Sequence, residues 1–295
     1  MSSDAMIEAR GLGKRYERFA LEGVSFRLER GEVMGLIGPN GAGKTTTIRL
    51  LMGAAKPSSG SFSLLGGNPR GDRRLLGRVG FVFEDCRFYG SLSISANARF
   101  VGRLYPGWDG RAFRGRLEAF GLDERAKVDG LSKGQRTKFA LAVALSHGAE
   151  LLVLDEPTSG LDPVSRSEIL DILYGFISGG DSSVLFSTHI TQDLERIADR
   201  VTFLREGRLV FSEATGEVLA RHALVKGPAA ALPALRGGLV GVREAATGFE
   251  GLTDRAGELA AARGAPAEGL VVERASLEDI MVYSTREDYR VRVGA

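Results

Sequence analysis

The chain has 295 residues, of which 43% are apolar and 26% charged, the balance of a folded globular protein with a sizeable core. A formal net charge of only +2 creates no strong positive field, so we expect no nucleic-acid partner. The single cysteine, Cys86, excludes an internal disulfide and a cysteine-based metal site. The N-terminus lacks the pattern of a signal peptide, and no apolar run approaches the roughly 20 residues of a spanning helix. We therefore expect a chain that does not itself cross a membrane.

The first 65 residues are predicted to form mainly strands. Apolar or alternating segments predict strands at residues 7–10, 20–28, 33–37 and 61–65. The segment Val33–Ile37 is short and apolar, which is typical of a buried strand. A Gly-rich loop follows it, and a helix is expected from about Gly43 to about Gly53.

Strands and helices alternate through the middle of the chain. Residues 93–128 have a helical, polar pattern, and a second helix is predicted at 134–146. The apolar run Leu151–Leu154 predicts a strand that is buried on both faces of a mainly parallel sheet. Helices are then expected at 163–177 and 191–198, and strands at 183–187, 201–203 and 208–211. This alternation predicts an α/β fold. His147 and His222 are expected at the surface.

The texture changes after about Ala220. Residues 227–270 are rich in Ala, Gly and Leu and contain three prolines. We therefore expect a main domain over residues 1–220, and a small α+β appendage or partly mobile tail over residues 221–295.

A complete phosphate-binding motif, G-x-x-x-x-G-K-[ST], lies between the strand and the helix predicted around residue 40. Glycines let backbone N–H groups curl around phosphate oxygens, and the helix N-terminus adds partial positive charge. We expect Lys44 to reach the β- and γ-phosphates of ATP and Thr45 to bind Mg²⁺. A Gly-rich turn that matches by chance is the alternative, and the flanking strand and helix argue against it. The expected nucleotide contacts are Gly38, Pro39, Asn40, Gly41, Ala42, Gly43, Lys44, Thr45 and Thr46.

Two carboxylates, Asp155 and Glu156, end the apolar strand that begins at Leu151. Beside a phosphate-binding loop, one carboxylate can hold Mg²⁺ and a second can accept a proton from the attacking water. We assign Asp155 to the metal and Glu156 to the general base. On its own, a strand ending in a solvated acidic turn would be an equal alternative; the pairing with the phosphate loop favours the site.

Further motifs resemble those of the ATP-binding cassette (ABC) ATPases, in the family's order from about Ile7 to Glu213. Leu131-Ser132-Lys133-Gly134-Gln135 is similar to the family's LSGGQ signature, and Asp155 to Asp162 resembles its acidic strand end and D-loop. Ser187-Thr188-His189 resembles its switch-histidine segment. Tyr16 stands where the family has an aromatic residue that stacks on adenine.

The resemblance implies a fold and a mechanism. The implied fold is a P-loop NTPase ABC cassette: a mainly parallel sheet core, an antiparallel β subdomain and a helical subdomain at about 87–146. Two copies, identical or homologous, would sandwich two ATP molecules, each facing the other copy's Ser132, Gly134 and Gln135. His189 would contact the γ-phosphate and steady the base, and Asp162 would link the two sites.

The sequence departs from the family pattern at two positions. Lys133 replaces the first signature glycine, and we expect little effect. Glu84 replaces a glutamine that in most members touches Mg²⁺ and the attacking water. Glutamate can also bind Mg²⁺, so we assign Glu84 to the metal site; a solvated acidic turn with Asp85 is the alternative.

The family's transport function implies that this chain is the ATPase motor of a membrane transporter. Its partner would be an integral membrane permease on a separate chain, docked on the helical region after Arg87. The chain would then be cytoplasmic and peripheral on the inner face of the cell membrane. Glu84, the Ser132–Gln135 signature and the segment 275–280 resemble subunits of drug or lipid exporters. The alternative is a soluble ABC ATPase that acts on ribosomes or DNA; the chain has one cassette and no strongly basic face, which argues against it.

Overall fold

The computed structural model describes residues 5–84, 88–245, 247–257 and 269–285, and Cys86 lies outside these ranges. The chain folds into two compact units. The first contains Met1–Asp193 and Ile197–Ser212, and the second contains Leu194–Arg196 and Glu213–Ala295. None of the described helices combines the length and the apolar character needed to span a bilayer.

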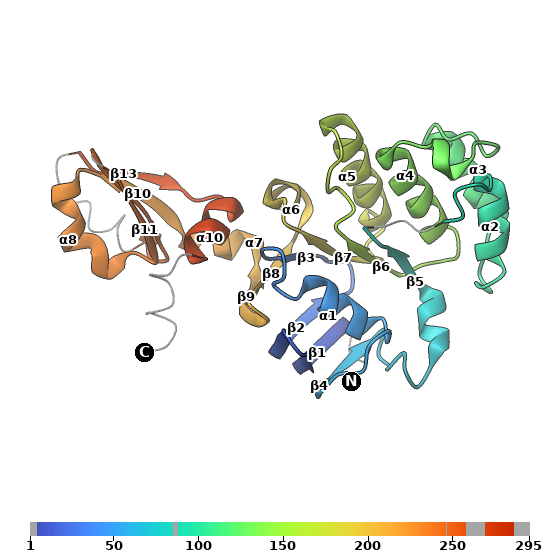
Figure 1. Ribbon diagram of the computed structural model, residues 1–295, viewed down its shortest axis with the longest axis horizontal. Helices are drawn as coiled ribbons and strands as arrows, with labels where there is room; N and C mark the ends of the chain where they lie inside the picture. Colours follow the sequence, from blue (N-terminus) through green and yellow to red (C-terminus); the bar gives the residue numbers. More distant parts are fainter. Residues whose placement is uncertain (1–4, 85–87, 246, 258–268, 286–295) are drawn as a thin grey trace. The chain divides into compact units, whose positions relative to one another are not determined.

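A nine-stranded sheet in the order β4-β1-β2-β9-β8-β3-β7-β6-β5 forms the centre of the first unit (Figure 1). One side is antiparallel, because β1 pairs with both β2 and β4. The other side is parallel: β7 lies between β3 and β6, and β5 follows β6. The strands are β1 (Ala5–Arg15), β2 (Ala20–Glu29), β3 (Val33–Ile37), β4 (Ser59–Leu64), β5 (Val79–Val82), β6 (Leu151–Asp155), β7 (Ser183–Thr188), β8 (Arg200–Arg205) and β9 (Arg208–Ala214).

The parallel strands form the most deeply buried part of this sheet. Every residue of β3, β6 and β7 is buried, which explains why apolar residues dominate β3 and β6 and fill the middle of β7. Helix α1 (Lys44–Leu51) packs against β4 and β6, and α5 (Pro163–Ile177) packs against β7. Because the strands are parallel, the carboxyl ends of β3, β6 and β7 lie at one edge of the sheet.

A second core lies within the helical part of the first unit, formed by α2 (Ile94–Gly102), α3 (Gly110–Ala119) and α4 (Lys133–Ala144). Helix α4 contacts both α2 and α3, and Phe139 of α4 is completely buried. The apolar core of these helices is separate from that of the sheet. The 3-10 helix η2 (Val128–Gly130) precedes α4 in this region, and another 3-10 helix, η1 (Arg73–Arg78), precedes β5.

The expectation that His147 and His222 are surface residues is wrong. His147 is only 3% exposed; its ring stacks on Tyr105 at a centroid distance of 3.9 Å, and Nδ1 lies 3.1 Å from the Gly77 carbonyl oxygen. His222 is 7% exposed, and its Nδ1 lies 2.8 Å from the Val218 carbonyl oxygen. A carbonyl can only accept, so both Nδ1 atoms donate. Each ring is buried because a backbone acceptor satisfies its donor, which the local sequence does not reveal.

The described part of the second unit is an antiparallel sheet with short helices. Its strand order is β11-β12-β10-β13. Val225, Leu232, Leu239 and Phe249 form its apolar core. The elements are α7 (Thr215–Arg221), β10 (Ala223–Gly227), η3 (Ala229–Ala231), α8 (Leu232–Leu235), η4 (Arg236–Gly238), β11 (Gly241–Ala245), β12 (Gly248–Thr253), β13 (Val271–Arg274) and α10 (Leu277–Ser284); helix α6 (Thr191–Ile197) contains Leu194–Arg196.

Candidate functional site

Two positions of the loop between β3 and α1, Gly38 and Gly43, have a backbone conformation and close neighbours that only glycine accommodates. Gly38 has φ 151°, and a Cβ added there would lie 2.2 Å from the Leu204 carbonyl oxygen. Gly43, at the start of α1, has φ 110°, and its Cβ would lie 2.8 Å from Leu21 Cδ1. Positive φ and close backbone approach are the conditions that select glycine. The loop therefore has the shape that a phosphate-binding cradle requires, with the N-terminus of α1 at its end.

Lys44 is the first residue of α1 and is only 6% exposed. Its Nζ donates to the carbonyl oxygens of Gly38, at 2.7 Å, and Pro39, at 3.4 Å. The same Nζ lies 3.2 Å from Glu156 Oε1. A buried ammonium needs such partners. The lysine is thus folded over its own loop and paired with the carboxylate that follows β6.

Asp155, the last residue of β6, accepts two hydroxyl hydrogen bonds on one oxygen. Ser187 Oγ donates to Asp155 Oδ1 at 2.6 Å, and Thr45 Oγ1 donates to the same atom at 3.2 Å. Ser187 Oγ also accepts the backbone N–H of Glu156 at 3.1 Å. We assigned no role to Ser187 from the sequence; the signal for it was its position at the end of a strand predicted to lie in the same parallel sheet as β6.

Glu156 lies between a lysine and a histidine. While Oε1 is close to Lys44, Oε2 lies 2.8 Å from His189 Nδ1 and accepts the His189 backbone N–H at 3.3 Å. Glu156 is 8% exposed and has φ 52°, a left-handed conformation that is strained for a residue with a side chain. His189, by contrast, has 44% of its side chain exposed. A strained, fixed carboxylate beside an accessible histidine is an arrangement that can orient water and accept its proton.

The oxygen atoms of Thr45 and Asp155 fit a magnesium ion. Mg²⁺ in nucleotide sites is held by one or two protein oxygens together with waters and phosphate oxygens. Across residues 5–84, 88–245, 247–257 and 269–285, no group of three or more His, Cys, Asp and Glu side chains is arranged to hold a metal. Glu84 is exposed just beyond β5, and no hydrogen bond or ion pair among the described residues joins it to Thr45 or Asp155. Its assignment to the metal stays a prediction.

The signature residues begin helix α4. Ser132 is the N-cap: its Oγ accepts the Gln135 N–H at 3.2 Å, and Gln135 Oε1 accepts the Ser132 N–H at 2.9 Å. This reciprocal capping box fixes the helix start. A Cβ on Gly134 would lie 2.7 Å from Ser165 Oγ of α5, so close packing on α5 explains this glycine. Within the described part of one chain, no hydrogen bond or ion pair joins Ser132, Gly134 or Gln135 to the phosphate-binding loop.

Asp162 caps helix α5. Its Oδ1 accepts the backbone N–H groups of Val164 and Ser165, each at 3.0 Å, and its Oδ2 accepts the Ser165 hydroxyl at 2.7 Å. These hydrogen bonds, that of the Ser165 N–H above all, lower the pKa of the Asp162 carboxyl, which stays ionised at neutral pH. The side chain is otherwise exposed to solvent.

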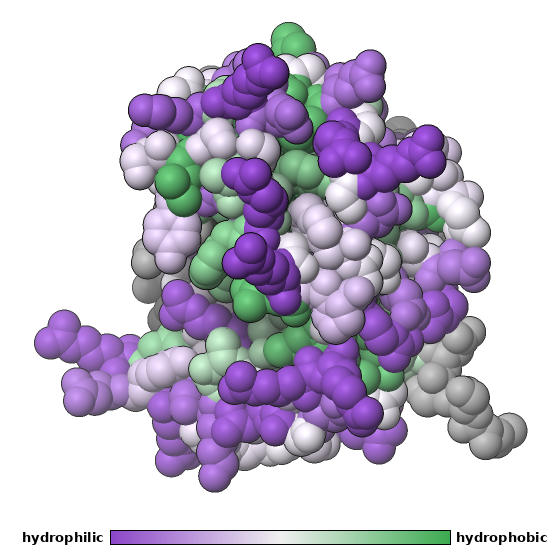
Figure 2. Space-filling view, turned by 90° about the vertical axis from the view of Figure 1, so that its right-hand side faces the viewer, coloured by the Kyte–Doolittle hydropathy of each residue, from purple (hydrophilic) through white to green (hydrophobic). Residues whose placement is uncertain are grey.

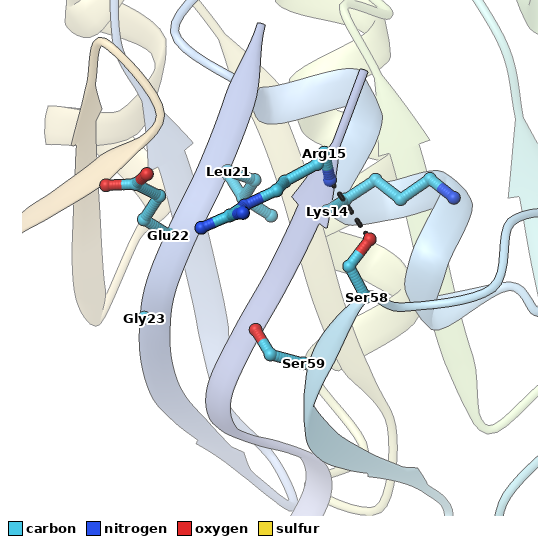
Figure 3. Close-up of a pocket in the computed structure, with 7 residues that line it drawn as sticks. All are labelled: Lys14, Arg15, Leu21, Glu22, Gly23, Ser58 and Ser59. Carbon is cyan, nitrogen blue, oxygen red and sulfur yellow. Dashed lines mark hydrogen bonds between the residues drawn. The ribbon is translucent and has the colours of Figure 1, made fainter. Parts of the chain in front are cut away.

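Tyr16 follows β1 and is 47% exposed, so its ring is available to another flat group. Lys14 Nζ lies 5.3 Å from the ring centroid. A surface cavity of about 540 Å³ adjoins this turn (Figure 3), and in it the Arg15 N–H donates to Ser58 Oγ at 3.1 Å. The cavity is lined by residues of β1, β2 and the start of β4 and includes no residue of the phosphate-binding loop.

The sheet order, the phosphate-type loop after β3 and the carboxylate pair after β6 define the class of phosphate-loop nucleoside triphosphatases. Residues 21–159 match a family model described as ABC transporter. The chain is 37% identical over 211 residues to the uncharacterized ABC transporter ATP-binding protein YxlF of Bacillus subtilis, covering 69% of each protein. It is 36% identical to the Nod factor export ATP-binding protein I of Ralstonia nicotianae, over 71% of this chain and 67% of that protein.

A solved structure gives the same result. CbiO1 from Clostridium perfringens, part of the ABC transporter complex cbiONQ, superposes with a TM-score of 0.65 and 28% identity over 74% of this chain and 91% of that one. The chain belongs to the ABC transporter family and is an ATP-binding, ATP-hydrolysing motor subunit. Subunits of this kind bind nucleotide, dimerise and pair with membrane permeases. The relatives support this role and not a soluble ATPase acting on ribosomes or DNA.

Proposed function

We propose that the chain hydrolyses ATP with Glu156 as general base and His189 as its orienting partner, and that this reaction drives a permease on a separate chain. The observation that carries the proposal is the position of the Glu156 carboxylate, which lies between Lys44 and His189 at the carboxyl end of β6. Burial of this carboxylate next to the phosphate-type loop supports a role in proton transfer over a solvated turn.

The Lys44–Glu156 ion pair would change when ATP binds. The lysine would move from Glu156 Oε1 to the β- and γ-phosphates. This move is short, because its ammonium group already lies against the carbonyl oxygens of the phosphate-binding loop. Glu156 Oε1 is then free for a water molecule, while His189 holds Oε2. The water oxygen attacks the γ-phosphorus, its proton passes to Glu156, and the bond to the β-phosphate oxygen breaks with ADP as leaving group.

Mg²⁺ is the metal that the site would hold, with Thr45 and Asp155 as its protein oxygens. When bound, it neutralises charge on the phosphates. Ser187 supports Asp155 through its hydroxyl. Glu84 is assigned to the same ion by resemblance alone, at the end of β5.

The signature residues support a reaction between two copies of the domain. Ser132, Gly134 and Gln135 stand at the amino end of α4, where backbone N–H groups and the helix dipole favour an anion. Because no hydrogen bond or ion pair among the described residues joins them to the loop of their own chain, we propose that they face the ATP on a partner cassette. Asp162, ionised and exposed, would link the two sites, and Tyr16 would stack on adenine.

We propose that the permease docks on the helical part of the first unit and that the complex is an exporter at the inner face of the cell membrane. Tyr89, Leu92, Phe100 and Leu104 are large apolar or aromatic side chains that are each more than two-fifths exposed in this region. Figure 2 views this side of the molecule and shows green apolar surface between purple hydrophilic residues. The exporter assignment is supported by the relative from Ralstonia nicotianae.

The test is Glu156→Gln in the full-length chain. Amide for carboxylate keeps the shape and removes the base, so we expect ATP hydrolysis to fall at least about 100-fold with ATP binding retained. The ATP-bound dimer should accumulate in size-exclusion chromatography. Glu168→Gln is the matched control, because Glu168 is a half-exposed carboxylate paired only with Lys138 among the described residues. A Glu156→Gln variant that hydrolyses ATP at the rate of this control would refute the assignment.

A further inference from the structure

A largely buried hydrogen-bond network joins the segments that follow Glu156 and His189 in the chain. Thr158 Oγ1 donates to Asp193 Oδ2 at 2.7 Å, and Arg166 Nε donates to Asp193 Oδ1. Thr158 is fully buried and Asp193 is 1% exposed. None of the three side chains was singled out by its sequence, and none has a role in the reaction proposed above.

We infer that Thr158 and Asp193 are positioning residues, which hold the general base and the switch histidine in register for hydrolysis. The inference rests on the proposed function, because it assumes that Glu156 and His189 act together. The reason lies in the chain connections: Thr158 follows Glu156 by two residues, and Asp193 follows His189 by four. The Thr158–Asp193 hydrogen bond therefore joins the same two segments that the Glu156–His189 contact joins.

The hydrogen bond between Thr158 and Asp193 adds a constraint that the contact between Glu156 and His189 does not supply. The contact of Glu156 Oε2 with His189 Nδ1 involves a side chain that is nearly half exposed, so alone it would constrain the segments weakly. Glu156 also has a left-handed backbone, which persists only where the surroundings determine it. The Thr158 hydroxyl and the Asp193 carboxylate form a hydrogen bond that is shielded from water and is therefore strong.

Arg166 compensates the negative charge of the buried Asp193 carboxylate through an ion pair. An ionised group at 1% exposure needs a charged or hydrogen-bonded partner, and Asp193 has both on its two oxygens. Arg166 belongs to α5, the helix that Asp162 caps. The network thus connects the segment after β6, the segment after β7 and α5, the helix that Asp162 caps.

The experiment compares Thr158→Val with Thr158→Ser in the full-length chain. Valine keeps the shape of threonine and removes the hydroxyl, whereas serine keeps the hydroxyl. We expect Thr158→Val to lower kcat for ATP hydrolysis about 10-fold with KM for ATP within about twofold, and Thr158→Ser to restore at least half of the wild-type kcat.

Thr202→Val is the matched control. Thr202 is also fully buried, and its hydroxyl donates to Met34 Sδ at 3.3 Å and is hydrogen-bonded to Ser212 Oγ at 2.8 Å. It lies in β8, outside the segments that carry Glu156 and His189. A kcat of Thr158→Val equal to that of Thr202→Val would overturn the inference, as would equal kcat values for Thr158→Val and Thr158→Ser. Glu156→Gln, measured in parallel, separates the two failures: a fully active Glu156→Gln refutes the proposed function, whereas an inactive one leaves it standing when the positioning role fails.

Discussion

The strand ends of the first unit and the sheet of the second unit differ in where their polar and charged side chains lie. At the ends of β3, β6 and β7, buried polar side chains are satisfied by one another and by nearby backbone groups, and Glu156 has a strained backbone. In the second unit the core is apolar, and the charged pairs, such as Lys226 with Glu273 at 2.7 Å, lie at the surface. Buried polar networks and strain reduce stability unless every group is satisfied. The difference indicates that the strand ends of the first unit are arranged for the reaction at the expense of stability, whereas the second unit is arranged for stable packing.

The largest expected effect is that of a methyl group at Gly38. Gly38→Ala would place Cβ 2.2 Å from the Leu204 carbonyl oxygen at a φ of 151°, so the phosphate-binding loop cannot keep its shape. We expect ATP binding, measured by equilibrium dialysis, to be lost. Gly216→Ala in α7 is the control from the second unit, because no atom lies within 4 Å of the added Cβ and alanine favours helices. If both variants bind ATP like the wild type, the close packing around Gly38 is not required for nucleotide binding.

A smaller effect is expected from removing one buried hydroxyl in each unit. Ser187→Ala removes the hydrogen bond of 2.6 Å to Asp155 and should cost about 1–3 kcal/mol, because a buried carboxylate loses the closer of its two hydroxyl donors. Thr253→Val removes two bonds between uncharged groups, one of 3.0 Å to the Gly238 carbonyl and one of 3.2 Å from the Arg255 N–H, and should cost about 0.5–1.5 kcal/mol. Trp108, the only tryptophan, reports unfolding of the first unit in urea, and amide exchange in β10 reports the second. The reverse order of the two costs would contradict the comparison.

The smallest effect is a pH dependence in the second unit. Burial lowers the pKa of His222 below its ordinary value of 6.5. The hydrogen bond to the Val218 carbonyl opposes this shift, as do the charges of Asp254 and Glu213, while Arg221 adds to it. The folded state then binds fewer protons than the unfolded state, so stability is complete above about pH 6.5 and falls as the pH decreases below it. His222→Asn keeps a donor for the Val218 carbonyl and removes the titration. Between pH 7 and 5.5, the stability reported by amide exchange in β10 should fall more in the wild type than in this variant. Equal slopes of stability against pH would exclude His222 as the cause.

Local motifs were sufficient to predict the phosphate-binding loop, the carboxylates after β6 and the alternation of strands and helices. A loop that needs positive φ needs glycine, a buried strand needs apolar residues, and a helix start needs a cap such as Ser132 or Asp162. These requirements act over a few residues, so they are visible in the order of the amino acids.

What the tertiary structure decided is the partners of those residues. The contact of Lys44 with Glu156 spans 112 positions of the sequence, and that of Thr158 with Asp193 spans 35. Both arise because β7 lies between β3 and β6 in the parallel sheet, which brings three distant strand ends together. The burial of His147 and His222 was decided in the same way, by the backbone carbonyl placed next to each ring. Sequence determined which groups can do the chemistry, and strand order determined which of them meet, because pairing between strands depends on contacts that no local pattern contains.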